Sequence, residues 1–161
     1  RLHNSHELSG WAETRCEMKC RILTTAIFVM LAAISALSQT DRPPFASYKG
    51  VSIGIPIENA RAILGNPKET VEKQDFYLFS ENESMQVFYE DGKTVTAIMV
   101  TFVGVLDTAP SAKNVFGEEV AANEDGSFFK MVRYPKAGFW ISYSHAATAD
   151  KMINIAMQKI N

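Results

Sequence analysis

Residues 59–65 spell Asn-Ala-Arg-Ala-Ile-Leu-Gly and residues 111–117 spell Ser-Ala-Lys-Asn-Val-Phe-Gly, two versions of one pattern 52 positions apart. Apolar residues at this spacing favour a short amphipathic helix. The closing glycine ends the helix, because glycine adopts positive φ without a steric penalty. We expect the apolar pair of each copy to pack on a sheet and the basic residue to face away. The pairs are Ile63-Leu64 and Val115-Phe116, and the basic residues are Arg61 and Lys113.

Strand-like runs of aromatic, β-branched and alternating residues follow each predicted helix. They cover residues 75–79, 84–90 and 94–103 after the first helix, and 127–134, 139–145 and 152–159 after the second. The sequence therefore predicts an α+β fold with two layers, in which short helices lie on one face of an antiparallel sheet. We expect a single domain at 50–161, built from two tandem helix-strand-strand-strand units at about 50–105 and 108–161.

The 52-residue offset also relates predicted strands to one another. It aligns residues 76–77 with 128–129, both aromatic, and residues 87–89 with 139–141. Phe88 and Trp140 thus become equivalent positions of a duplicated unit. The alternative interpretation is a chance similarity between two amphipathic segments.

The segment 18–38 has the order of a secretory signal peptide. Lys19 and Arg21 precede a mostly apolar stretch at 22–34, and the small residues Ala36 and Ser38 precede a predicted cut before Gln39. We expect residues 1–17 to be upstream, non-native or misannotated sequence, and residues 39–49 to be a lead-in. The stretch is shorter than the roughly 20 residues of a membrane span, although an uncleaved anchor or a buried helix is an alternative. The protein is therefore expected to be secreted or periplasmic.

The predicted mature chain carries neither a thiol nor a strong charge. Cys16 and Cys20 both precede the predicted cut. From Gln39 onward 12 Lys/Arg stand against 15 Asp/Glu, because four of the 16 basic and three of the 18 acidic residues come earlier. This balance argues against a nucleic-acid partner. We also expect no membrane span after cleavage.

Residues 50–67, GVSIGIPIENARAILGNP, combine a glycine-initiated turn, a short helix and a Leu-Gly-x-Pro ending. This pattern resembles the opening of the SmpA/OmlA, or BamE-like, envelope proteins. The tandem arrangement is similar to that of β-lactamase inhibitor protein, whose two related units present a concave sheet. The resemblance implies an exported protein that binds other macromolecules. BamE-like lipoproteins carry a cysteine at the cleavage site, whereas this chain has Gln39 there, so no lipid anchor is expected.

Candidate chemical groups are sparse in the mature chain. His145 is its one histidine, with Ser142, Ser144 and Asp150 nearby, but no G-x-S-x-G motif is present. The acidic segment 118–126 lacks the ligand order of an EF-hand. The sequence therefore predicts no catalytic residue, no cofactor and no metal site, and an enzyme is the less favoured interpretation.

Two aromatic residues stand out as candidate binding residues. Alternation along a strand places Phe88 and Trp140 on otherwise polar faces. Their same-face neighbours are Gln86 and Glu90 for Phe88, and Ser142 and Ser144 for Trp140. Aromatic side chains in polar surroundings are typical of interface hot spots, although ordinary sheet aromatics covered by a loop are the alternative.

These observations predict an exported, non-enzymatic binding protein that recognises another envelope or extracellular protein through an open sheet face. The alternative is a small secreted hydrolase or ligand-binding domain that uses the same cleft.

Overall fold

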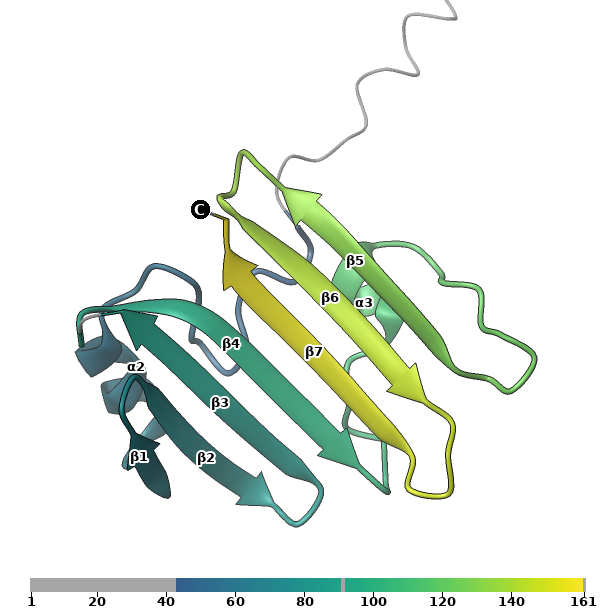
Figure 1. The fold of residues 1–161 in the computed structure, drawn as a ribbon, viewed down its shortest axis with the longest axis horizontal. Coiled ribbons are helices and arrows are strands. Elements are labelled where there is room, and N and C mark those ends of the chain that lie inside the picture. Colours follow the sequence, from purple (N-terminus) through teal and green to yellow (C-terminus); the bar gives the residue numbers. More distant parts are fainter. Residues whose placement is uncertain (1–42, 91, 161) are drawn as a thin grey trace, which may run out of the picture. The chain divides into compact units, whose positions relative to one another are not determined.

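The computed structural model describes residues 43–90 and 92–160, so the predicted signal peptide at 18–38 and the segment 1–17 lie outside the described residues. Seven strands form one antiparallel sheet in the order β1-β2-β3-β4-β7-β6-β5 (Figure 1). The strands are β1 (Glu69–Val71), β2 (Gln74–Ser80), β3 (Glu83–Glu90), β4 (Thr94–Val103), β5 (Phe128–Tyr134), β6 (Phe139–Ala146) and β7 (Met152–Lys159). Two short helices lie within the described residues, α2 (Ile57–Leu64) and α3 (Ala112–Phe116).

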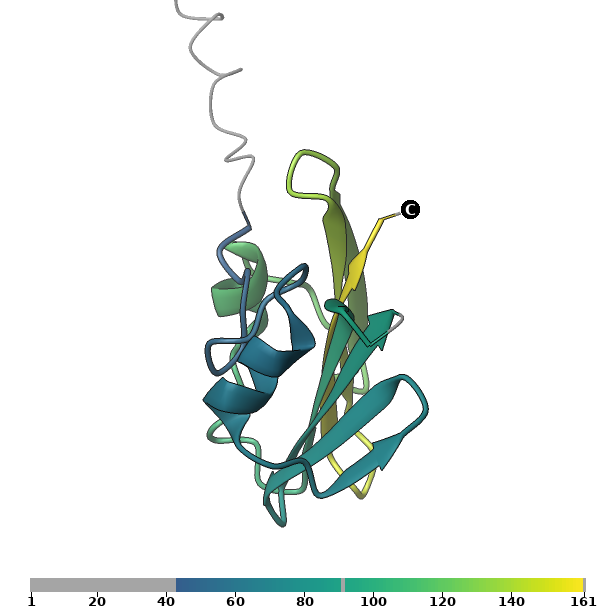
Figure 2. The same ribbon diagram turned by 90° about the vertical axis from the view of Figure 1, so that its left-hand side faces the viewer.

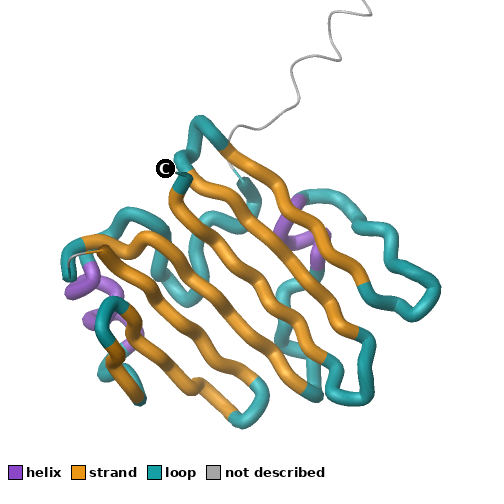
Figure 3. Tube along the Cα trace, viewed as in Figure 1, coloured by secondary structure: helices purple, strands orange, loops and turns teal. Residues whose placement is uncertain are grey.

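The α+β class is confirmed, and six of the seven strands lie where alternation predicted them. The first edge strand, β1, was not predicted because three polar or β-branched residues carry no periodic signal. The last strand of each half meets at the centre of the sheet, where β4 pairs antiparallel with β7 (Figure 3). The strands that precede α3 and the strands that follow it therefore belong to one continuous sheet.

Both helices lie on the same face of the sheet (Figure 2). Every second residue of the central strands is buried on that covered face, as β3 shows with Met85, Val87 and Tyr89. α2 buries Ile57 and Ala60. α3 contributes a second group of buried side chains, Ala112, Val115 and Phe116. Within residues 43–90 and 92–160, the core consequently fills one side of the sheet, and no helix or loop layer covers the other side.

The predicted helix orientation is right for α3 but partly wrong for α2. Val115 and Phe116 are buried as expected, and Leu64 packs against the core. Ile63, however, is 52% exposed. The face of α2 that packs on the sheet contains Ile57 and the residues three, four and seven positions after it. This spacing includes Arg61 and leaves Ile63 on the outer side.

The 52-residue offset does not extend through all of the strands. Tyr77 is buried, whereas Phe129, its partner at that offset, is 65% exposed on the other face. Phe88 and Trp140 keep the same face at that offset, although Phe88 is the sixth residue of β3 and Trp140 is the second residue of β6. The hairpins differ in length, and a one-residue slip moves a side chain to the opposite face of a sheet. The correspondence predicted from the offset is therefore wrong for β2 and β5, whereas residues 87–89 and 139–141 agree in which side chains are buried.

Candidate functional site

The uncovered face of the sheet contains both aromatic residues that the sequence singled out. Phe88 lies between the buried residues Val87 and Tyr89, so its own side chain points away from the core. Trp140 lies between two further buried residues, Phe139 and Ile141, and points the same way. Both side chains are half-buried by their neighbours on the sheet.

Cross-strand pairing aligns these two aromatics in one row. Phe88 pairs with Ala97 on β4, Ala97 with Gln158 on β7, and Gln158 with Trp140 on β6. Adjacent strands are about 4.8 Å apart, so three steps place the two backbones about 14 Å from each other. We call this set the aromatic row: Gln74, Phe88, Ala97, Gln158, Trp140 and Arg133.

Two further rows run parallel to the aromatic row, and the three rows together are called the open face. The second row is Phe76, Gln86, Met99, Ala156, Ser142 and Met131. The third row is Leu78, Ser84, Thr101, Asn154, Ser144 and Phe129.

Charge is nearly absent from the open face. Arg133 is the one charged residue that β2 to β7 contribute to the three rows, although 21% of the whole chain is charged. On the edge strand β1, Glu69 pairs with Phe76 and adds an acidic residue at the margin of the second row. Aromatic residues, methionine and arginine are enriched at the centres of protein interfaces, where lysine and acidic residues are depleted. The open face follows that pattern in its aromatic residues, its methionines and its low charge, whereas its three serines and two alanines are residue types that interfaces contain less often.

The six predicted binding residues have different places on this surface. Five of them belong to the open face, namely Phe88, Trp140, Gln86, Ser142 and Ser144. Glu90 is exposed at the end of β3, beyond the three rows, where it pairs with Thr94. Sequence reasoning missed the neighbours on β4 and β7, because strand order decides which residues complete a row. One such pair is Thr101 and Asn154, whose side chains are hydrogen-bonded at 2.7 Å.

A small polar hollow lies beside the aromatic row. Its volume is about 260 Å³, and its walls are Lys73, Tyr89, Glu90, Thr96, Gln158 and Lys159. The pairing of β3 with β4 is irregular here, since Phe88 opposes Ala97 but Tyr89 opposes Val95. Pockets for small ligands usually measure about 300–1,000 Å³. The hollow therefore suits a single polar side chain of a partner better than a separate small molecule.

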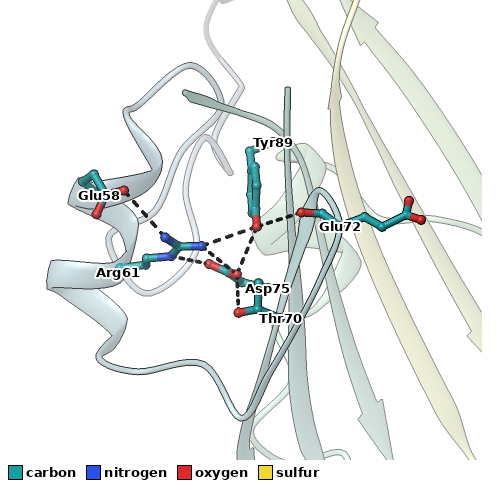
Figure 4. Close-up of polar contacts among 6 residues, drawn as sticks. All are labelled: Glu58, Arg61, Thr70, Glu72, Asp75 and Tyr89. Carbon is teal, nitrogen blue, oxygen red and sulfur yellow. Dashed lines mark hydrogen bonds and ion pairs between the residues drawn. The ribbon is translucent and has the colours of Figure 1, made fainter. Parts of the chain in front are cut away.

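A polar network under the covered face attaches α2 to the sheet (Figure 4). Asp75 on β2 is fully buried. Arg61 donates from Nε to Asp75 Oδ2 at 2.8 Å and from Nη2 to Oδ1 at 3.1 Å. The Thr70 hydroxyl donates to the same Oδ1 at 2.9 Å. The Tyr89 hydroxyl lies 3.4 Å from Oδ1 and from the Glu72 carbonyl oxygen.

This network keeps the buried carboxylate ionised. Burial by itself opposes ionisation of Asp75, but the hydrogen bonds from Arg61 and Thr70 and the charge of Arg61 outweigh it, so the pKa of Asp75 lies below its ordinary value. Burial, followed by the nearby charge of Asp75, raises the pKa of Tyr89. A carboxylate that already accepts these bonds is a structural anchor instead of a proton-transfer group.

The sequence contained a signal for this network. Arg61 follows Ile57 by four residues and therefore shares its helix face. Asp75 precedes the buried Tyr77 by two and shares its strand face. A carboxylate at a core position requires a hydrogen-bonding or charged partner, and Arg61 is the cation on the face of α2 that packs against the sheet. The expectation that Arg61 faces away from the sheet is therefore wrong.

His145 is separated from the nearby serines by strand alternation. Ser142 and Ser144 face the open side, whereas His145 points to the covered side with its Nδ1 3.1 Å from the Gly126 carbonyl oxygen. The ring also contacts Phe128 at a centroid distance of 5.5 Å. These serines and this histidine do not form a nucleophile–base pair. Within residues 43–90 and 92–160 no three His, Cys, Asp or Glu side chains gather as metal ligands would.

Comparisons with models of known families, with curated proteins and with solved structures found no match to this chain. The resemblance to BamE-like proteins and to β-lactamase inhibitor protein stays a prediction. Among the described residues, no helix has the length and apolar character needed to cross a membrane.

Proposed function

We propose that this is an exported, non-enzymatic protein of the envelope or extracellular space, and that it recognises another protein through the open face. Export is supported by the signal-peptide order of residues 18–38. Recognition is supported by the single observation that Phe88 and Trp140 lie in one row of a face on which β2 to β7 place one charged residue, Arg133.

The low charge of the open face lowers the cost of removing water from it when a partner binds. Removing water from a charged side chain costs far more than removing it from an amide, a hydroxyl or an aromatic ring. The open face can therefore be covered by a partner at low cost, and its two large aromatics supply apolar contact area. Its three rows hold 18 residues, close to the roughly 20–30 that each side of a standard interface contributes.

The arrangement of the chain as two tandem units belongs to the same proposal. Each half consists of a short helix followed by antiparallel strands, and the halves join through β4 and β7. A duplicated unit of this kind doubles the width of a sheet without adding an exposed edge at its centre. The strand registers of the two units would have diverged after duplication.

The proposal is tested by placing a photo-crosslinking residue on each face in exporting cells. A probe at Ser142, two residues from Trp140 on the same face of β6, samples the open face, and a matched probe at Lys113 samples the exposed side of α3 on the covered face. We expect a specific crosslinked protein with the first probe only. Equal capture by both probes would contradict recognition through the open face.

The captured partner then allows a direct affinity measurement. Trp140→Ala is expected to weaken binding by about 10-fold or more, the loss typical of an interface hot spot. Lys113→Ala is the control and should leave the dissociation constant unchanged. Unchanged affinity in Trp140→Ala, with the fold intact by circular dichroism, would overturn the proposal.

A further inference from the structure

The two edges of the sheet are built differently. β1 is three residues long and contains Glu69, so it offers little backbone for pairing. β5 is a regular strand of seven residues at the opposite edge. In the part of the chain that the structure describes, β5 pairs with β6, and its other backbone bonds are those that the Tyr134 carbonyl accepts from Ala137 and Gly138. An unprotected edge of this length is a template for another strand.

The exposed side chains of β5 are also unusual for a free edge. Phe129 is 65% exposed and Met131 is 50% exposed, side by side on the open face. Arg133 follows on the same face and is exposed. Lys130 points to the covered face, where it binds Glu118 and lies 5.3 Å from the centre of the Phe116 ring. The charge of Lys130 is therefore already balanced within its own chain.

A second copy of β5 complements this edge in one particular register. When two β5 strands pair antiparallel about Met131, the middle residue of the strand, all seven residues of each strand are paired. On the open face, Met131 then opposes Met131 of the second copy, and Phe129 opposes Arg133. An arginine beside an aromatic ring and two apposed methionines are both favourable pairs. On the covered face, Lys130 opposes Val132, so no two like charges meet.

We propose that two copies of this chain associate through β5, antiparallel and centred on Met131, into a two-fold symmetric dimer with one continuous sheet. Each copy has one long free edge, so the contact closes at two subunits and does not propagate into a fibre. The two open faces would become a single surface twice as wide. This assembly is independent of the identity of any external partner.

Sedimentation velocity and light scattering over a dilution series test the association. The unmodified protein is expected to show the mass of a dimer that dissociates on dilution. Met131→Lys places two like charges opposite each other at the two-fold axis and should give a monomer at every concentration. The matched control is Leu78→Lys on β2, since Leu78 is 45% exposed on the same face but far from β5. It should remain dimeric.

Cysteine crosslinking tests the register. In the chain with Cys16 and Cys20 replaced by serine, Met131→Cys places two thiols opposite each other. Paired residues in an antiparallel sheet have Cα atoms about 4.5–5.5 Å apart, within the range that a disulfide bridges. Mild oxidation should give a crosslinked dimer with Met131→Cys and none with Arg133→Cys. A monomeric mass throughout the dilution series, a dimer that survives Met131→Lys, or crosslinking at 133 instead of 131 would each overturn the proposal.

Discussion

The two helices have similar sequences and rest on the same sheet, but different forces attach them. α2 buries Ile57 and Ala60 and fixes its central turn through the ion pair of Arg61 with the buried Asp75. α3 is anchored by apolar side chains, chiefly Val115 and Phe116. Lys113, which matches Arg61 in the heptapeptide pattern, is exposed and pairs with a surface glutamate at 3.3 Å.

One local sequence pattern can therefore pack against a sheet in two different ways. Alanine, a basic residue, apolar residues and a closing glycine suffice to form either helix. Whether the basic residue points toward the sheet depends on whether the strand beneath the helix carries an acidic side chain opposite it. β2 provides Asp75, whereas the position 52 residues later is Ser127, which lies before β5.

The largest expected effect is at α3. Phe116→Ala removes a nearly fully buried ring that contacts Tyr143, and it should lower the free energy of unfolding by about 3–5 kcal/mol. Urea denaturation followed by circular dichroism measures this loss. Because α3 is only five residues long, a loss below about 1 kcal/mol would show that its apolar anchor is not what holds the helix.

The ion pair of α2 should be next in size. Arg61→Met leaves the carboxylate of Asp75 buried without its main partner and should cost about 3 kcal/mol, at the lower end of the range for broken buried pairs because Arg61 is partly exposed. The matched variant Lys113→Met should change stability by less than about 0.5 kcal/mol. Equal losses in the two variants would refute the contrast between the helices. Adding Asp75→Leu to Arg61→Met should recover much of the loss, since it removes the unpaired charge.

Acid should weaken α2 selectively. The pKa of Asp75 is lower in the folded protein than in the unfolded chain, where it is about 3.9. The stabilisation from its ionised form is therefore complete above that pH and is lost as the pH falls through the lower, folded value. Urea denaturation from pH 7 to pH 2 should show a steeper acid loss for the natural chain than for Asp75→Asn. Parallel curves would indicate that Asp75 contributes nothing to acid sensitivity.

The smallest expected effect concerns how the helices begin. The Ser111 side chain accepts a hydrogen bond from the Asn114 backbone N–H, whereas α2 begins after Pro56 without a side-chain cap. Ser111→Ala should lower the free energy of unfolding by about 1 kcal/mol. Ser111→Asp is the control and should retain the cap. If alanine and aspartate behave alike in urea denaturation, the cap does not stabilise α3.

The sequence by itself determined the class of the fold and the positions of most elements. Alternation is a local property, so it located β2 to β7 to within one or two residues, and the glycines after Leu64 and Phe116 located both helix ends. It also placed Phe88 and Trp140 on the faces opposite to their buried neighbours.

Only the tertiary structure decided which of these residues meet. The pairing of β4 with β7 brings Phe88 and Trp140 into one row, and no local pattern encodes that neighbour. The pairing of Arg61 with Asp75 likewise depends on where α2 crosses β2. The 52-residue offset failed between β2 and β5 for the same reason, because turn lengths set the register and a shift of one residue reverses the face. Periodicity assigns a side chain to a face, but contacts between distant segments are chosen by the packing of the whole chain.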